Sequence, residues 1–159
     1  AKASGVAKSS IYRRWPGSAA IVMDAFLGTV GPAISYADEG DVVARFRDST
    51  GRFLEVLGGD PGRLLRELVG LAQHDEALRR ALLDRWIAPR RAMGAAVIAE
   101  ARARGELAPD ADAEVILDMV YGAIYYALLM PHRPLDRRHL ERVVEAAFRP
   151  YLSPPAARP

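Results

Sequence analysis

Apolar side chains recur every three or four residues along most of the chain, which is the spacing of one face of an α-helix. Glycine and proline separate these stretches, and aspartate precedes several of them, as is usual at helix ends. Sustained alternation of apolar and polar residues is missing, and so are Asn-Gly and Asp-Gly hairpin turns. The pattern predicts an all-α fold, with helices over residues 18–30, 41–57, from 61 onward, 75–104, from 110 or 112 to about 130, and 134–152.

The longest predicted helix, residues 75–104, contains Pro89 in its middle and ends at Gly105. Proline lacks the amide hydrogen that a helix uses, and its ring collides with the preceding turn. We therefore expect this helix to be kinked near Pro89.

The last two predicted helices carry apolar stripes that suit a helical hairpin, and two copies of a hairpin can form a four-helix bundle. The first helix is apolar on most of its faces, which favours burial against both its own domain and a partner chain. The alternative is that both stripes face their own domain. The pattern predicts a homodimer whose interface contains Leu117, Val120, Ile124, Leu128, Leu140, Val144, Ala147 and Tyr151.

The amino-terminal segment Ser4–Pro16 reads as a turn at Gly5, a short helix over Lys8–Trp15, and a stop at Pro16. Ile11 and Trp15 lie four residues apart and form an apolar seam. The remaining side chains are basic or hydroxylated, as in a helix that reads the major groove of DNA. They are Lys8, Ser9, Ser10, Tyr12, Arg13 and Arg14.

Charge and composition indicate a basic amino-terminal segment attached to a larger, slightly acidic domain. The chain has 159 residues, half of them hydrophobic, so it can bury one good core. The first sixteen residues carry +4 and the whole chain +2, which leaves −2 for the remainder. There is no cysteine, the apolar run Met119–Met130 is too short to cross a bilayer, and no leader opens the chain. We expect a cytoplasmic protein with no membrane partner.

The amino-terminal segment resembles the second half of the helix-turn-helix of tetracycline-repressor-type (TetR) regulators. That pattern runs Ala-Gly-Val-Ser-Lys-Gly-Thr-Leu-Tyr-x-His-Phe-x-Ser-Lys-Glu, and Gly5-Val6, Lys8, Ile11-Tyr12 and Trp15-Pro16 match it in register. Residues 82–91, 104–110 and 122–136 resemble one carboxyl-terminal type of the same family. The similarity covers nearly the whole chain and is weakest between Gly31 and Arg63.

The resemblance implies a partial helix-turn-helix and linker over residues 1–30, and an effector-binding and dimerisation domain over residues 31–159. Family members carry a further helix and a half upstream, so the chain is expected to be incomplete at its amino terminus. The implied function is a ligand-responsive repressor of a palindromic double-stranded DNA operator. Ser9, Ser10 and Arg13 would reach base edges, while Lys8, Tyr12 and Arg14 would hold phosphates.

Two departures from the family pattern keep an alternative open. Ala7 stands where the family usually has a capping serine, and Gly17-Ser18-Ala19 replaces its Ser-Lys-Glu. The alternative is a helical homodimer that binds a small molecule but no longer binds DNA.

The family resemblance also implies an effector pocket walled by the helices at residues 41–57, 76–104 and 112–130. Large aromatic and sulfur-containing side chains suit an apolar or aromatic ligand, although each of them could equally be ordinary core. The candidates are Phe53, Trp86, Met93, Met119, Tyr121 and Tyr125.

The sequence contains none of the common catalytic motifs that we considered. The chain lacks His-Glu-x-x-His, Gly-x-Ser-x-Gly and a glycine-rich phosphate loop. His74, His132 and His139 are too far apart and too poor in nearby acids to predict a metal site. We expect no enzyme activity, no metal and no cofactor.

Overall fold

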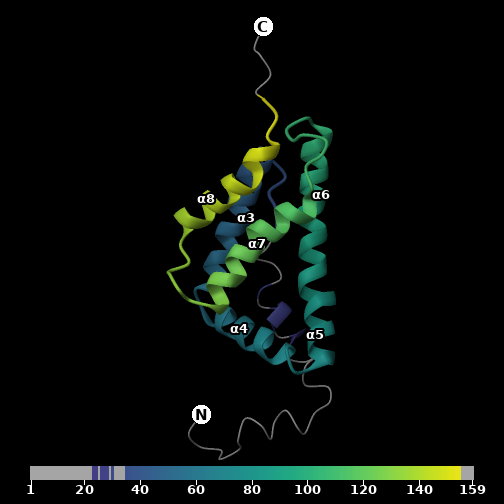
Figure 1. Ribbon diagram of the computed structural model, residues 1–159. Helices are drawn as coiled ribbons and strands as arrows, with labels where there is room; N and C mark the ends of the chain where they lie inside the picture. Colours follow the sequence, from purple (N-terminus) through teal and green to yellow (C-terminus); the bar gives the residue numbers. More distant parts are fainter. Residues whose placement is uncertain (1–22, 25, 29, 31–34, 155–159) are drawn as a thin grey trace, which may run out of the picture.

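The computed structural model describes residues 23–24, 26–28, 30 and 35–154, and its regular elements there are all helices (Figure 1). The predicted all-α fold class is therefore confirmed. In chain order the elements are α3 (Val42–Leu57), α4 (Asp60–Ala72), α5 (Glu76–Leu82), the π-helical turn η2 (Leu83–Ile87), α6 (Ala88–Ala103), α7 (Ala113–Leu129), α8 (Arg137–Phe148) and the 3₁₀ turn η3 (Arg149–Tyr151).

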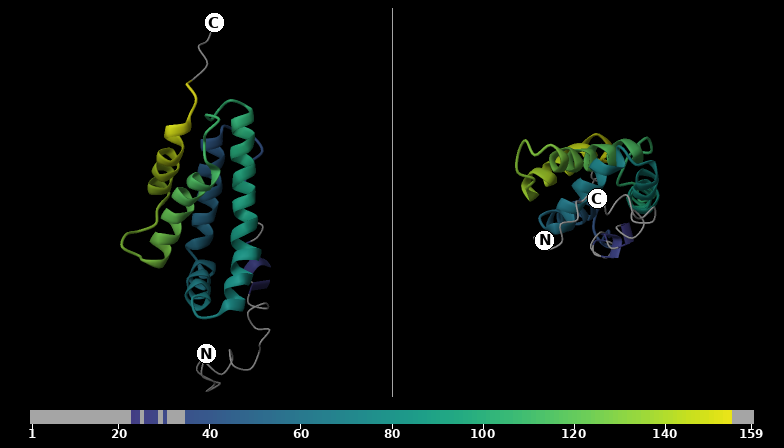
Figure 2. Two further views of the ribbon diagram at one scale, coloured as in Figure 1. Left: turned by 45° about the vertical axis from the view of Figure 1, so that its right-hand side comes forward. Right: turned by 90° about the horizontal axis from the view of Figure 1, so that it is seen from below.

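The longer helices form a bundle that is closed at one end by α4 and α5 (Figures 1 and 2). Helix α7 packs against both α6 and α8, and α3 packs against α8. The described part of the segment 23–30 is helical and lies at the α5 end, where Met23, Phe26 and Val30 are buried in the same core as α4 and α5. The predicted linker helix is thus docked on the body through these three side chains.

Aspartate starts four of the helices, as the sequence pattern predicts. In each case Oδ1 accepts a hydrogen bond from a backbone N–H in the first turn, which would otherwise lack a partner. The capping residues are Asp41, Asp75, Asp112 and Asp136, with shortest N–O distances of 2.8, 3.0, 2.9 and 2.8 Å.

The helix predicted over residues 75–104 is divided into α5, η2 and α6. Pro89 lies in the first turn of α6, and its missing N–H and bulky ring would disturb a regular α-helical turn around Arg85. The chain widens into the π-helical turn Leu83–Ile87 directly before it. This turn contains Trp86, whose side chain is fully buried.

The predicted dimer stripe requires a correction. Seven of its eight side chains are at most 4% exposed within a single chain, and they belong to the protomer's own core. A side chain with no accessible surface has nothing left to bury against a partner. The stripes therefore face their own domain at Leu117, Val120, Ile124, Leu128, Leu140, Val144 and Ala147, while Tyr151 is half-buried.

Helices α6 and α7 approach each other closely at Gly94, which is buried. A Cβ added there would lie 2.6 Å from Leu117 Cδ2 and 2.9 Å from the Tyr36 hydroxyl oxygen. We expect Gly94→Ala to lower the free energy of unfolding by about 1–3 kcal/mol, because the packed core has to shift. Denaturant unfolding measures this.

Gly70→Ala is the matched control. Gly70 lies in α4, and nothing occupies the space within 4 Å of its added Cβ. Alanine is a better helix former than glycine, so this variant is expected to gain up to about 1 kcal/mol. Equal effects of the two substitutions would contradict the close approach of α6 and α7.

Candidate functional site

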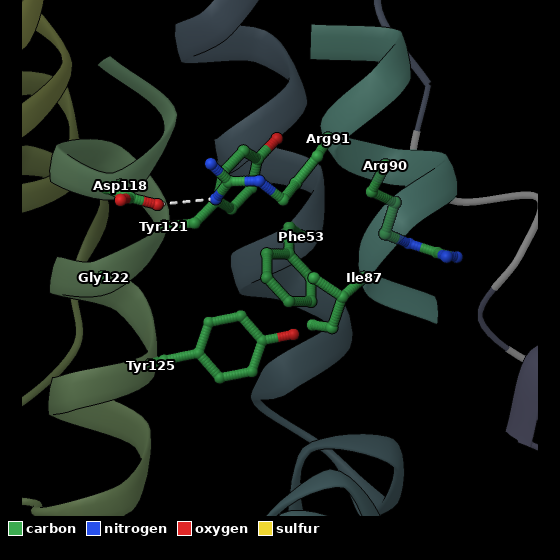
Figure 3. Close-up of a pocket in the computed structure, with 8 residues that line it drawn as sticks. All are labelled: Phe53, Ile87, Arg90, Arg91, Asp118, Tyr121, Gly122 and Tyr125. Carbon is green, nitrogen blue, oxygen red and sulfur yellow. Dashed lines mark hydrogen bonds and ion pairs between the residues drawn. The ribbon is translucent and has the colours of Figure 1, made fainter. Parts of the chain in front are cut away.

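A cavity of about 370 Å³ opens between α3, α6 and α7 beside the π-helical turn (Figure 3). Its volume falls within the range of small-molecule sites. Phe53 reaches it from α3, Ile87 from η2, and the other lining residues come from α6 and α7. The full lining is Phe53, Ile87, Arg90, Arg91, Asp118, Tyr121, Gly122 and Tyr125.

Helix α7 supplies half of this lining because of its residue spacing. Asp118, Tyr121, Gly122 and Tyr125 stand at positions i, i+3, i+4 and i+7, so they share one face of the helix. The two tyrosine rings lie 6.5 and 6.4 Å from the ring of Phe53, centroid to centroid. Gly122 contributes no side chain, and the space beside it stays open. The result is an aromatic cavity that suits an apolar ligand.

Both tyrosines of the cavity use their hydroxyl groups in hydrogen bonds. The Tyr121 hydroxyl lies 2.6 Å from that of Tyr36, and the Tyr125 hydroxyl accepts from Trp86 Nε1 at 2.6 Å. Burial raises the pKa of Tyr36 and of Tyr121, and it raises the pKa of Tyr125 to about 12. All three hydroxyls are therefore neutral at physiological pH and can act as hydrogen-bond donors or acceptors.

Two consecutive arginines border the cavity in different environments. Arg91 forms ion pairs with Glu114 and with Asp118, the latter at 2.6 Å. The hydrogen bond that it donates to the Glu114 carboxylate is the main reason its pKa is raised. Figure 3 shows Arg91 reaching toward Asp118.

The neighbouring Arg90 points away from Phe53 and Tyr125 (Figure 3). Its guanidinium carbon lies 3.4 Å from the centroid of the Trp86 ring, and Nη1 donates to the Trp86 carbonyl oxygen at 3.0 Å. The described residues include every Asp and Glu of the chain, and none of these pairs with Arg90. Burial without such a counter-ion lowers the pKa of Arg90. Its cation–π contact with Trp86 is therefore part of what holds this side chain in place.

The structure brings together three of the six predicted ligand-binding residues, Phe53, Tyr121 and Tyr125. Trp86 lies behind Tyr125, fully buried and outside the lining. Met93 and Met119 were placed wrongly, because they are 39% and 45% exposed on outward faces of α6 and α7.

Sequence reasoning missed five lining residues, namely Ile87, Arg90, Arg91, Asp118 and Gly122. The helical spacing around Tyr121 and Tyr125 could have identified Asp118 and Gly122. The other three depend on how η2 rotates the start of α6, which the sequence pattern does not reveal.

The predicted DNA-reading side chains lie outside the described residues. Their assignment stays a prediction for Lys8, Ser9, Ser10, Tyr12, Arg13 and Arg14. Across the described part of the chain, no three His, Asp or Glu side chains gather as a metal site would require. In that same part, no helix combines the length and apolar character needed to span a bilayer.

Residues 36–147, from Tyr36 to near the end of α8, match the family described as "Tetracyclin repressor-like, C-terminal domain". The chain belongs to the TetR family of transcriptional regulators. It is also 30% identical over 149 residues to the HTH-type transcriptional regulator YdeS of Bacillus subtilis (strain 168), covering 94% of this chain and 75% of that protein.

Solved structures agree with membership in the TetR family. The crystal structure of the TetR family transcription regulator SCO0332 is 34% identical, with a TM-score of 0.79, and the match covers 93% of this chain and 82% of that one. A TetR-family structure from Mesorhizobium loti MAFF303099, 18% identical with a TM-score of 0.56, shares the fold. These relatives are helix-turn-helix regulators, so the chain is a transcriptional regulator and not an enzyme.

The buried tyrosines predict how stability depends on pH. An unfolded tyrosine ionises near pH 10, whereas the folded chain keeps the Tyr125 proton up to about pH 12. The free energy of unfolding should therefore be unaffected by this group below pH 10 and fall as the pH rises from 10 to 12.

Tyr125→Phe removes one of the responsible groups. We expect the fall in stability between pH 10 and 12 to become shallower by about 1.4 kcal/mol per pH unit, the slope that one proton contributes. Urea unfolding at a series of pH values measures it. An unchanged slope would show that Tyr125 is accessible to solvent.

Proposed function

We propose that this chain is a homodimeric, ligand-responsive repressor whose effector binds in the cavity between α3, α6 and α7. The cavity carries the proposal, because protein cores are close-packed and a largely apolar space of about 370 Å³ suits a bound small molecule. Its lining suits an apolar or aromatic small molecule. Such a regulator acts in the cytoplasm, where its operator lies.

The position of the linker helix supports a mechanical link from the cavity to DNA. Phe26 packs on Trp86 with ring centroids 4.6 Å apart, and Asp24 forms an ion pair with Arg85. A ligand that moves η2 and α6 would therefore move the helix that follows the predicted reading segment. The effector has to bind the two arrangements with different affinities for operator binding to change.

At the other end of the linker, Lys8–Arg14 would enter the major groove in each protomer. Two-fold symmetry requires a palindromic operator with half-sites about one helical turn (~34 Å) or a multiple apart. Ser9, Ser10 and Arg13 would contact bases, and Lys8, Tyr12 and Arg14 would contact phosphates.

The dimer surface we propose is the outward face of α7 and α8. This face of α7 exposes Val115, Met119 and Tyr126 at 44%, 45% and 59%. Ala146 of α8 is exposed as well. Apolar side chains exposed at helical spacing on neighbouring helices suit a four-helix bundle with a second copy.

The competing function is a dimeric small-molecule sensor without DNA binding. The sequence departures at Ala7 and Gly17-Ser18-Ala19 favour it, because they remove a helix cap and a phosphate-contacting lysine found in the family pattern. Operator selection with the full-length protein, followed by affinity measurements at several salt concentrations, separates the two functions.

Arg13→Ala tests the reading segment directly. We expect operator affinity to fall about 5- to 150-fold, with relaxed preference at one base position, because a lost base contact costs about 1–3 kcal/mol. Arg66→Ala removes the same charge from an exposed position on α4 and should change the affinity less than twofold. Equal effects of the two variants would contradict the assignment of a base contact to Arg13.

Met119→Asp tests the dimer surface. A charge at this exposed apolar position should weaken the dimer by at least about a hundredfold, because the carboxylate would be buried at the interface. Leu71→Asp, on α4 and 38% exposed, is the control and should leave the dimer intact. Sedimentation equilibrium measures both, and an unweakened Met119→Asp dimer would place the interface elsewhere.

The effector hypothesis needs its own measurement. Compounds that raise the melting temperature are identified first, and each is then titrated into the complex of full-length protein and operator. We expect at least one aromatic binder to weaken operator binding. Unchanged operator affinity at saturation with every binder would contradict a ligand response.

A further inference from the structure

Trp86 connects the wall of the cavity with the linker helix through a single side chain. It is fully buried within the π-helical turn η2. Its indole Nε1 donates to the hydroxyl of Tyr125, which lines the cavity, at 2.6 Å. Its ring centroid lies 4.6 Å from that of Phe26 in the linker segment. One rigid side chain thus contacts both elements.

Trp86 can only donate in its hydrogen bond with Tyr125, which lines the cavity. An indole has a single N–H donor and no acceptor, so a buried Trp86 depends on the Tyr125 hydroxyl to satisfy it. Tyr125 reaches from α7 across the cavity toward Ile87 (Figure 3). A ligand that turns the Tyr125 ring would leave a buried N–H without a partner, which strongly disfavours the original position of Trp86.

Further contacts restrict how Trp86 can respond. The Arg90 guanidinium lies 3.4 Å from the centre of the indole ring and donates to the Trp86 carbonyl oxygen, which ties the ring to the start of α6. On the linker side, the Phe26 contact is accompanied by the ion pair between Arg85 and Asp24. Movement of Trp86 therefore disturbs the docked helix rather than an empty space, because Phe26 itself is only 2% exposed.

We propose that the hydrogen bond between Trp86 and Tyr125 is the switch that connects the cavity to the linker helix. While the bond is formed, Trp86 holds Phe26 and keeps the linker helix docked. When the Tyr125 hydroxyl is displaced, Trp86 shifts and the linker helix loosens. Trp86 is here a positioning residue, and the direction of the signal from cavity to operator rests on the proposed function above.

The test uses amide hydrogen exchange of the full-length protein, which reports local opening without requiring a known effector. Tyr125→Phe keeps the ring in the cavity wall but removes the acceptor. We expect the peptide that spans residues 23–30 to exchange at least fivefold faster, while α8 exchanges at the wild-type rate. The fivefold value corresponds to the lower bound of about 1 kcal/mol for an unpaired buried donor.

Tyr126→Phe is the matched control. It removes the same hydroxyl from the adjacent residue, whose side chain is 59% exposed. Exchange over residues 23–30 should stay within twofold of wild type in this variant. Unchanged exchange in Tyr125→Phe, or an equal rise in both variants, would overturn the proposal.

A second variant keeps the test decisive if Tyr125→Phe destabilises the whole chain. Trp86→Phe preserves an aromatic ring beside Phe26 but lacks the N–H, and it too should speed exchange over residues 23–30. The hydrogen bond can be lost only once, so adding Tyr125→Phe to Trp86→Phe should produce less than the product of the two separate effects. Fully multiplicative effects would overturn the proposal.

The aromatic fluorophore 8-anilinonaphthalene-1-sulfonate serves as the ligand in the last step. Its binding should speed exchange over residues 23–30 in the wild type and have at least fivefold less effect in Tyr125→Phe. An equal effect in both proteins would overturn the switch. The failure of any operator to bind would instead contradict the proposed function and leave the exchange results to decide the switch.

Discussion

The structure depends on how the consecutive helical elements α5, η2 and α6 accommodate Pro89. Pro89 cannot donate to the preceding turn, and the chain responds with the wider turn Leu83–Ile87. This turn carries Trp86 into the core and sets the rotation of α6, so that Arg90 covers the indole while Arg91 reaches the acids of α7. The position of Ile87 in the cavity wall, the contact of Arg90 with Trp86 and the contact of Phe26 with Trp86 all depend on this wider turn.

Helix α7 is apolar on most of its faces, and each face has a different environment. One face packs into the core against α6 and α8, a second face lines the cavity with two tyrosines, and a third leaves Val115, Met119 and Tyr126 exposed. A helix with apolar side chains on three faces does not have the single apolar stripe of an ordinary surface helix. The predicted burial against the helix's own domain is confirmed, whereas burial of another face against a partner chain stays a prediction.

Several polar side chains of the site are joined in pairs. Tyr121 is joined to Tyr36, Tyr125 to Trp86, and Arg91 to two acids. Leaving a buried polar group without a hydrogen-bond partner costs free energy. A ligand that binds one member of such a pair therefore destabilises the position of the other member. In the proposed function, a ligand that displaces one member of such a pair would change operator binding through the linker helix.

The sequence alone determined the helical class, the family, and the helix starts at Asp41 and Asp75, because caps and spacing are local properties. It left the next start at Asp110 or Asp112 and placed the last near residue 134, and the structure has the caps at Asp112 and Asp136. It also identified Phe53, Tyr121 and Tyr125 as pocket residues. It failed where neighbouring positions on one helix differ only in the direction they face. Met93 and Met119 point outward, whereas Leu117, Val120, Ile124 and Leu128 point into the protomer's own core. Only the tertiary structure decides such directions, because they depend on how each helix is rotated against its neighbours, and periodicity fixes the width of an apolar face but not what covers it.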